Sequence, residues 1–257
     1  MGILNITPDS FSDGSHYNTL EQAERRALSM IDSGVDIIDI GGESTRPGAA
    51  SVGEQEEIDR VVPIIERIRG CGVNISIDTS KAAVMKAAVE AGANMINDVR
   101  ALQLDGALQT AAELEVPICL MHMQGKPRQM QQAPYYKDVV AEVLSFLQQR
   151  VKACENAGIG KQLISIDPGF GFGKTFEHNL MMLAHIERFA AFGLPVLAGL
   201  SRKSMLGEIT GKPVNQRLSS SLAVALVAMQ KGARIIRVHD VEETSDIRKV
   251  YMALHNA

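Results

Sequence analysis

Six side chains that could do chemistry lie at or just after the ends of short apolar runs. They comprise two carboxylates, one amide and three basic groups: Asp78, Asp167, Asn97, Lys203, Arg237 and His239. Paired carboxylates can bind the amidine-like N–C–NH₂ edge of a planar heterocycle through two hydrogen bonds. Basic side chains can hold a phosphate or pyrophosphate, to which arginine offers a planar fork. The set therefore predicts a site for a nitrogen heterocycle that carries a phosphate leaving group.

Any one of these residues alone is more simply explained by an ion pair at the surface. Their convergence depends on the elements that position them, which we expect to be eight β-strands. The expected strands span residues 2–6, 35–40, 73–78, 94–98, 117–122, 163–167, 195–201 and 234–239. A parallel (β/α)₈ TIM barrel requires eight strand-plus-helix units, and its catalytic groups lie where the carboxyl ends of the strands share one mouth. The six residues come from five of these strands, so the barrel would bring them together.

Segments with helical periodicity separate the strands. The expected helices span residues 20–33, 54–69, 82–91, 136–157, 176–192, 215–231 and 241–254. Several end at a glycine, as helices commonly do. We find no linker or break in composition, and 257 residues suit one barrel. The sequence therefore predicts an α/β protein with a single domain, residues 1–257.

Composition excludes several classes of protein. The net charge of −4 argues against general binding of nucleic acid. No apolar stretch approaches the roughly 20 residues that span a membrane, and no basic segment followed by an apolar core marks a secretory signal. Three widely spaced cysteines fit a reducing compartment better than a disulfide framework. We expect a cytoplasmic protein that binds neither nucleic acid nor membrane.

Some suggestive motifs do not match known sites. Residues 169–175 look like a phosphate-binding loop, but Pro168 stands where the G-x-x-x-x-G-K-T pattern needs its first glycine. His122 has no partner at zinc-ligand spacing, which favours a core or supporting role over a metal ligand. His178 and His185 are expected at the surface of a helix. The adjacent Met181 and Met182 are expected in the core.

The loops that follow the first two strands, residues 7–16 and 41–53, are rich in glycine and small polar residues. Loops of this composition can become ordered over a substrate. Ordinary solvated turns are an equally good interpretation of the composition alone.

Eight blocks with many glycine, acidic and basic residues cover nearly the whole chain. They are MGILNITPDSFSDG (1–14), IDIGGESTRPGA (38–49), IDTSK (77–81), INDVR (96–100), LMHMQG (120–125), DPGFGFGK (167–174), LSRKSMLG (200–207) and IIRVHDV (235–241). In this order they resemble the bacterial dihydropteroate synthase family. The resemblance implies a transferase of folate biosynthesis that joins 6-hydroxymethyl-7,8-dihydropterin pyrophosphate to p-aminobenzoate, releases pyrophosphate and uses Mg²⁺.

The resemblance also assigns residues to roles. Those matching the pterin and pyrophosphate site are Thr45, Asp78, Asn97, Asp167, Lys203, Arg237 and His239. Those matching the p-aminobenzoate site are Phe11, Arg46, Pro47, Phe170 and Ser201. Asn5 matches the residue associated with the metal ion. The catalytic set implied is Lys203, Arg237, His239, Asp78, Arg46 and Asp13.

The same resemblance implies partners and one departure from the family. Sulfonamides should compete with p-aminobenzoate, and a homodimer built on the last helices is expected. Family members usually carry a segment before the first strand that covers the lower end of the barrel. This chain begins almost at that strand, so we expect a barrel that lacks most of the segment.

Two other functions remain possible at this stage. A pterin-dependent methyltransferase would share the barrel and the pterin pocket but needs no pyrophosphate site, and the basic residues Lys203, Arg237 and His239 argue against it. A non-catalytic pterin-binding relative would not need Asn5, Asp13, Arg46 or Lys203. Both alternatives are therefore less favoured than the synthase.

Overall fold

A computed structural model describes residues 1–7, 16–44, 51–125 and 133–255. Within these ranges the chain forms eight parallel strands. They are β1 (Gly2–Asn5), β2 (Ile37–Gly41), β3 (Asn74–Asp78), β4 (Met95–Asp98), β5 (Ile118–Met121), β6 (Ile164–Asp167), β7 (Leu197–Ala198) and β8 (Ile235–Ile236). Each lies inside a predicted run or extends one residue beyond it, so the sequence placed all eight correctly.

The strands close into a ring in two parts. Strands β1 to β6 form one sheet in chain order, and β7 pairs with β8. Single parallel bridges join the parts, Ile166 to Val196 at one seam and Gly2 to Val238 at the other. At the second seam the backbone N–H of Ile3 donates to the carbonyl of Val238 at 2.9 Å. The molecule is therefore a (β/α)₈ barrel, which confirms the predicted fold.

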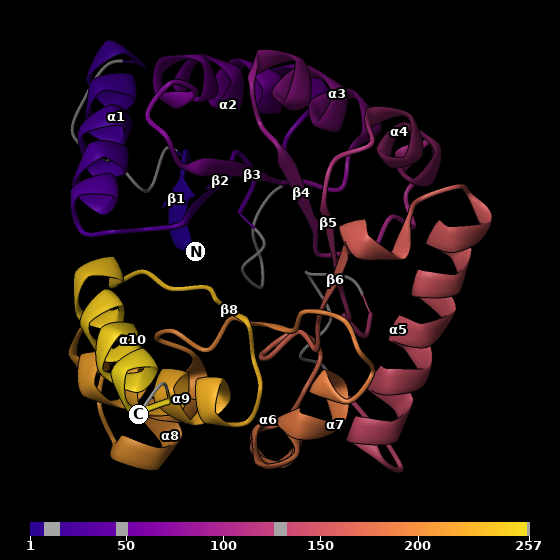
Figure 1. The fold of residues 1–257 in the computed structure, drawn as a ribbon, viewed down its shortest axis with the longest axis vertical. Coiled ribbons are helices and arrows are strands. Elements are labelled where there is room, and N and C mark those ends of the chain that lie inside the picture. The colour runs from indigo at the N-terminus through magenta and orange to yellow at the C-terminus, as the bar shows by residue number, and fades with distance from the viewer. Residues whose placement is uncertain (8–15, 45–50, 126–132, 256–257) are drawn as a thin grey trace.

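Helices surround the strands, with α1 to α5 following one another in chain order round one side and α6 to α10 covering the other (Figure 1). They are α1 (His16–Asp32), α2 (Glu54–Ile68), α3 (Ala82–Ala91), α4 (Ala107–Leu114), α5 (Val139–Asn156), α6 (Phe176–Ala184), α7 (Ile186–Ala190), α8 (Ser204–Thr210), α9 (Leu218–Gln230) and α10 (Val241–His255). Two 3₁₀ turns, Lys161–Leu163 and Val214–Gln216, precede β6 and α9. Within the described ranges, no helix combines the length and apolarity needed to cross a membrane.

Apart from shifts of a few residues at their ends, the helices differ from prediction at four places. Helices α4 and α8 were not predicted, and the single helix expected over residues 176–192 is divided at His185 into α6 and α7. The helix expected from residue 215 starts with a 3₁₀ turn. Met181 was wrongly assigned to the core, since 50% of its surface is exposed, whereas Met182 is buried as expected.

Alternation along the strands separates two apolar layers. Successive strand residues point to opposite faces, so every second residue faces the helices. Ile38, Ile40, Ile75 and Ile77 belong to this outer core. A smaller buried cluster of Met1, Met95, Cys119 and Leu197, with Ile37 and Ile235 packed against it, belongs to the start of the strands. The inward positions nearer the carboxyl ends are polar, and they form the candidate site.

Candidate active site

Strand pairing aligns three of the predicted site residues across neighbouring strands. Asn5 pairs with Gly41, Gly41 with Asp78, and Asp78 with Asn97. Gly41 contributes no side chain to this row. A Cβ atom there would lie 3.6 Å from Asn5 Oδ1 and 3.6 Å from Asp78 Cβ. The missing side chain therefore leaves the amide of Asn5 and the carboxylate of Asp78 facing the same space.

Arg237 links this row to a carboxylate that the sequence analysis did not assign to the site. Its Nε donates to Asp39 Oδ2 at 2.6 Å, and its Nη2 donates to Asp78 Oδ2 at 2.7 Å. Asn97 Nδ2 donates to the same oxygen of Asp39 at 3.0 Å. Asp39 is fully buried. It therefore orients both the arginine and the amide from beneath the mouth.

The charges of this group are incompletely balanced. Burial, the largest effect, raises the pKa of Asp78 to about 7, although the charge of Arg237 acts to lower it. Burial acts to lower the pKa of Arg237, but Asp39 and Asp78 outweigh it and raise that pKa. Among the described residues, Asp39 Oδ1 and Asp78 Oδ1 have no hydrogen-bond partner. One arginine between two buried carboxylates thus leaves acceptor oxygens for a ligand that can donate protons.

Asp167 and Lys203 lie on either side of the glycine-rich loop after β6. Asp167 is buried and accepts a hydrogen bond from the backbone N–H of Gly169 at 2.7 Å. Burial raises the pKa of Asp167 to about 6. The ammonium of Lys203 lies 4.4 Å from the centre of the Phe172 ring. Burial, followed by the charge of Arg237, lowers the pKa of Lys203 to about 8. Both groups would gain from a ligand of complementary charge.

Ser201 and His239 form a pair at the ends of the last two strand runs. Ser201 Oγ lies 3.0 Å from His239 Nδ1 and accepts from the His239 backbone N–H at 3.3 Å. Burial and then the charge of Arg202 lower the pKa of His239 to about 4. The sequence analysis grouped His239 with the potential cations. In this arrangement its ring is neutral at physiological pH, so it can offer an N–H donor but little charge.

The two parts of the barrel therefore differ in character. The six-stranded part contributes the acids and amides, namely Asn5, Asp39, Asp78, Asn97 and Asp167. The segments that follow β7 and β8 contribute Ser201, Lys203, Arg237 and His239. Such a mouth can bind a ligand with hydrogen-bond donors at one edge and negative charge at another.

Other predicted site residues are not brought into this group. Phe11, Asp13, Thr45, Arg46 and Pro47 lie outside the described residues. Phe170, expected beside p-aminobenzoate, is 1% exposed and belongs to the outer core cluster. It therefore presents no open face to a ligand in this arrangement.

One residue of the glycine-rich region, Lys174, was underestimated from sequence. Lys174 is buried at 3% exposure, and its Nζ lies 2.9 Å from His122 Nδ1. The His122 ring packs edge-on against Phe146 at 4.9 Å, which agrees with the core or supporting role predicted for it. Among the described residues, no three His, Cys, Asp or Glu side chains gather to hold a metal ion. The sequence analysis did single out the segment that contains Lys174. It compared that segment only with a phosphate-binding loop and, when the pattern did not match, gave the lysine no role.

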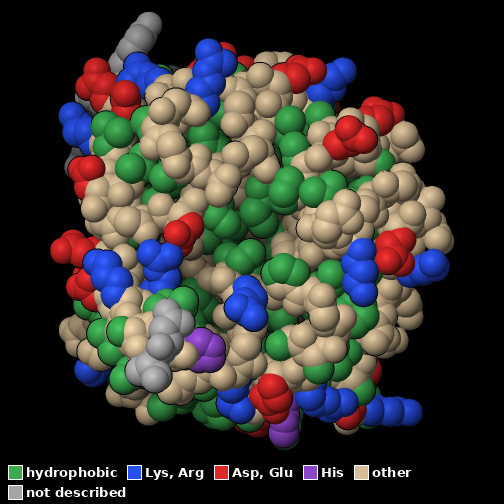
Figure 2. Space-filling view, viewed as in Figure 1, with side chains coloured by type: hydrophobic (Ala, Val, Ile, Leu, Met, Phe, Trp, Pro, Cys, Tyr) green, Lys and Arg blue, Asp and Glu red, His purple; other side chains and the backbone are tan. Residues whose placement is uncertain are grey.

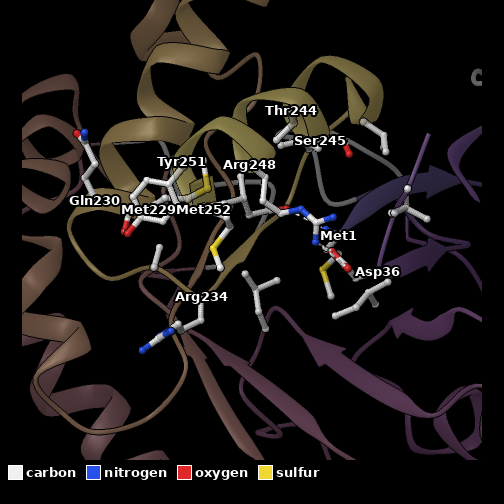
Figure 3. Close-up of a pocket in the computed structure, with 18 of the residues that line it drawn as sticks. Met1, Asp36, Met229, Gln230, Arg234, Thr244, Ser245, Arg248, Tyr251 and Met252 are labelled. Atoms are coloured by element: carbon white, nitrogen blue, oxygen red, sulfur yellow. Dashed lines mark hydrogen bonds and ion pairs between the residues drawn. The ribbon is translucent and has the colours of Figure 1, made fainter. Parts of the chain in front are cut away.

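A separate cavity of about 620 Å³ lies at the other end of the barrel, between the starts of β2 and β8 and helices α9 and α10 (Figure 3). Its lining includes Met1, the Asp36–Arg248 ion pair, and Tyr251, whose hydroxyl donates to the carbonyl of Met229. Figure 2, which views the end with the two termini, shows hydrophobic side chains gathered at the centre of this face. The cavity lacks the paired carboxylates of the mouth, since among the described residues its one lining carboxylate, Asp36, is paired with Arg248, so we do not assign the chemistry to it.

Comparison with known proteins agrees with this geometry. Residues 1–239 match the family described as "Pterin binding enzyme". The dihydropteroate synthase of Haemophilus influenzae is 54% identical, over 100% of this chain and 94% of that protein.

Solved structures agree as well. The Yersinia pestis dihydropteroate synthase with a sulfonamide drug complex is 52% identical, with a TM-score of 0.95, over 100% of this chain and 94% of that one. The Xanthomonas albilineans dihydropteroate synthase with 4-aminobenzoic acid is 51% identical, with a TM-score of 0.95, over 100% and 93%. With this level of identity across the full chain, the protein belongs to the dihydropteroate synthase family of pterin-binding enzymes.

Proposed function

We propose that this chain condenses 6-hydroxymethyl-7,8-dihydropterin pyrophosphate with p-aminobenzoate to give 7,8-dihydropteroate and pyrophosphate. The observation that supports it best is the arrangement of the mouth. Buried carboxylates with unpaired oxygens lie on one part of the barrel, and basic side chains lie on the other. A pterin pyrophosphate has proton-donating ring nitrogens at one edge and a pyrophosphate at the other. Membership of the family favours this substrate over other heterocyclic phosphates.

In this proposal Asp167, Asn97 and Lys203 bind the pterin ring. Asp167 accepts from the amino-pyrimidine edge. Burial raises its pKa, and hydrogen bonds donated by the ligand would offset that effect by stabilising the ionised carboxylate. Lys203 donates to the carbonyl side of the ring, and a carbonyl oxygen compensates part of the burial that lowers its pKa. Asn97 is fixed by the hydrogen bond from its Nδ2 to Asp39, so its carbonyl oxygen is already oriented. The ring would therefore bind to groups that need little rearrangement.

Arg237 and His239 stabilise the departing pyrophosphate. The reaction breaks the bond between the pterin methylene carbon and the pyrophosphate oxygen, and the electron pair leaves with the pyrophosphate. Arg237 stays charged because Asp39 and Asp78 raise its pKa. The neutral ring of His239 supplies an N–H donor. Groups aimed at charge that develops in the transition state lower the barrier more than they tighten substrate binding.

The residues present also fit a bound Mg²⁺, which the resemblance implies. Mg²⁺ is usually held by one or two protein oxygens together with water and substrate phosphates, rather than by a complete cage of side chains. Asn5 Oδ1 is such an oxygen, and it faces the same space as Asp78. When bound, Mg²⁺ would neutralise charge on the pyrophosphate.

The p-aminobenzoate nitrogen then attacks the methylene carbon, forms the new C–N bond and loses a proton to solvent. The electron-rich dihydropterin can delocalise the charge left on the methylene, and buried Asp78 and Asp167 favour that charge. The arylamine consequently needs correct positioning more than a strong base. We assign no general base among the described residues.

Sulfonamides are proposed as inhibitors because they present the same aniline group as p-aminobenzoate. The relatives from Y. pestis and X. albilineans have been solved with a sulfonamide and with 4-aminobenzoic acid, respectively. In this proposal Ser201 is the described residue that meets this substrate beside the pyrophosphate group, with Phe11, Arg46 and Pro47 expected from the loops. The sulfonamide and the 4-aminobenzoic acid bound by these relatives support a single site for both kinds of ligand in this chain.

We further propose a cytoplasmic homodimer. Helix α9 carries apolar residues on nearly all its sides, yet Leu218 and Val227 are more than a third exposed. Ile209 on α8 and Val214 just before α9 are more than half exposed. A helix that is apolar all round is normally buried, so a second copy of the chain would explain this surface. The described cysteines are free thiols, which suits a reducing compartment.

The test is release of pyrophosphate from 6-hydroxymethyl-7,8-dihydropterin pyrophosphate in the presence of Mg²⁺. We expect release to depend on p-aminobenzoate and to match the dihydropteroate formed. Asp167→Asn, which keeps the side-chain volume, should greatly reduce turnover in a folded protein. Release that proceeds equally without p-aminobenzoate, or no turnover by wild-type protein, would overturn the proposal.

A further inference from the structure

The glycine-rich segment after β6 ends in a lysine that the reaction described above does not use. Lys174 is 3% exposed, and no carboxylate lies within hydrogen-bond distance of its ammonium among the described residues. Its Nζ instead lies 2.9 Å from His122 Nδ1, 2.9 Å from the carbonyl of Gly169 and 3.0 Å from the carbonyl of Phe172. Burial lowers the pKa of Lys174 to about 7, against the charge of Asp167, and in its ammonium form the side chain has three protons to donate. Each of them therefore has an acceptor, and two acceptors belong to the loop itself.

His122 is suited to its place in this arrangement. Burial and then the charge of Lys174 lower the pKa of His122 to about 3, so its ring is neutral. With Lys174 as the donor to Nδ1, the proton of the neutral ring lies on Nε2. Edge-on packing against Phe146 fixes the plane of the ring. His122 thus offers Lys174 a fixed acceptor outside the loop, at the end of β5.

The loop has little freedom to move around this lysine. Gly169 has φ +72°, and a Cβ there would lie 1.9 Å from the carbonyl oxygen of His122. Gly173 has φ +64°, and a Cβ there would lie 2.4 Å from the carbonyl oxygen of Gln124. The hydroxyl of Tyr136 also donates to the carbonyl of Gly173 at 2.8 Å. The loop therefore lies directly against the end of β5, and Lys174 joins the two from inside.

Each end of the loop held by Lys174 contacts a residue that binds the pterin in the proposed function. The backbone N–H of Gly169 donates to Asp167, while the carbonyl of the same residue accepts from Lys174. The ring of Phe172 lies beneath the ammonium of Lys203, while the Phe172 carbonyl accepts from Lys174. One buried ammonium is therefore two contacts away from both Asp167 and Lys203.

From these contacts we propose that Lys174, seated on His122, is a positioning residue that sets the placement of Asp167 and Lys203 for the pterin ring. The inference rests on the proposed function, since it concerns binding of that substrate. Lys174 itself touches neither substrate nor reacting atoms. Lys174 thus donates hydrogen bonds to carbonyl groups of its own loop, whereas the lysine of the G-x-x-x-x-G-K-T motif that this segment resembles binds phosphate.

The main test replaces Lys174 by methionine, which keeps the length of the side chain and removes its donors. The carbonyls of Gly169 and Phe172 and Nδ1 of His122 would then lack a donor. An unpaired buried polar group costs about 1–3 kcal/mol. If the loop relaxes to avoid that cost, we expect the Kd for the pterin pyrophosphate to rise about tenfold or more. The KM for p-aminobenzoate, measured at saturating pterin, should change much less.

Variants of His122 form a matched pair. His122→Asn keeps an acceptor close to the position of Nδ1, whereas His122→Phe keeps an aromatic ring against Phe146 and removes the acceptor. We expect the phenylalanine variant to reproduce the loss seen with Lys174→Met and the asparagine variant to recover most of the pterin affinity. Because they act through the same lysine, these variants keep the proposal testable if Lys174→Met fails to fold.

A further variant and a control separate positioning from stability. Phe172→Leu removes only the ring beneath Lys203 and should cause a smaller loss of pterin affinity. Val84→Ala, in the buried face of α3, lowers stability far from the loop and should leave pterin affinity unchanged. Pterin affinity that is unchanged in Lys174→Met, or lost equally in Val84→Ala or His122→Asn, would overturn the positioning role. Wild-type protein that binds no pterin would instead overturn the proposed function.

Discussion

Replacing Arg237 by methionine should remove a cation that lies between two buried carboxylates, Asp39 and Asp78. Asp39 is fully buried, Asp78 is 8% exposed, and both accept hydrogen bonds from the guanidinium. Breaking a buried ion pair by deleting one partner costs about 3–5 kcal/mol because it leaves an uncompensated charge. Since the Arg237 side chain is only 20% exposed, little solvent screening reduces that cost. We therefore expect the variant to lose about 3–5 kcal/mol of unfolding free energy at pH 8.5.

The loss should depend on pH in a defined direction. Burial already raises the pKa of Asp78 to about 7, above the value of about 4 in an unfolded chain. Between these values the folded state binds more protons than the unfolded state, so stability falls as pH rises. Without Arg237 the pKa of Asp78 rises further, and the window extends to higher pH. The destabilisation should therefore be smaller at pH 5.5 than at pH 8.5.

Urea unfolding followed by circular dichroism measures this, because the chain has no tryptophan to report by fluorescence. Arg248→Met is a matched control. Arg248 binds both oxygens of Asp36 at 2.8 Å, but the two side chains are 43% and 63% exposed. Such exposed pairs contribute about 0–1 kcal/mol. The reasoning fails if Arg237→Met costs no more than Arg248→Met, or if its cost is the same at both pH values.

Three further predictions concern the mouth and its loop. Asp167→Asn should weaken pterin binding by about 1–3 kcal/mol, as measured by calorimetry. Its unfolding free energy at pH 8.5 should be unchanged or higher, since burial disfavours the ionised carboxylate. Unchanged pterin affinity would remove Asp167 from the site. Gly169→Ala should abolish pterin binding or folding, because its Cβ would lie 1.9 Å from the His122 carbonyl oxygen. Gly70→Ala, where a Cβ meets no atom within 4 Å, is the control and should behave as wild type in both assays. Sulfonamides should inhibit turnover competitively with p-aminobenzoate, and inhibition that excess p-aminobenzoate does not relieve would contradict a shared site.

The strands could be predicted because their signal is local. Each is an apolar run of a few residues ending in a polar one, and each is bounded by helix-length segments. Of the two helices that were missed, α8 is only seven residues long although Gly211 caps its C-terminus, and α4 lacks the usual local signals. Helix α4 starts after Gly106 without a side-chain cap, and it ends at Glu115, which takes φ +52° where glycine is usual. The division at His185 occurs without a glycine or proline. Tertiary packing, rather than local preference, sets these boundaries.

The site was predicted in part for a similar reason. Strand ends place Asp78, Asn97 and Asp167 at one mouth whatever the details of packing. Asp39 also lies near a strand end, but its importance comes from Arg237, which is 198 positions away in the chain. Likewise, the neutral state of His239 depends on burial and on neighbouring charges that periodicity does not reveal. Sequence pattern identifies candidate groups, whereas their protonation and pairing follow from the assembled barrel.

The two seams of the barrel give the ion pairs of Arg237 a mechanical meaning. Strands β6 to β7 and β8 to β1 are joined by single bridges, where the other neighbours form continuous ladders. The bonds from Arg237 to Asp39 and Asp78 cross from the shorter arc of strands to the longer one. The attraction between Arg237 and the two carboxylates thus adds to the few backbone hydrogen bonds that hold the two groups of strands together. In the proposed binding mode the substrate spans the same gap, because Asn97 and Asp167 belong to the longer arc, whereas Lys203, Arg237 and His239 follow the strands of the shorter one. The distance between the two groups of strands then depends on the bound substrate as well as on the protein. A ligand group that draws Arg237 away from Asp39 and Asp78 also weakens the closure of the barrel.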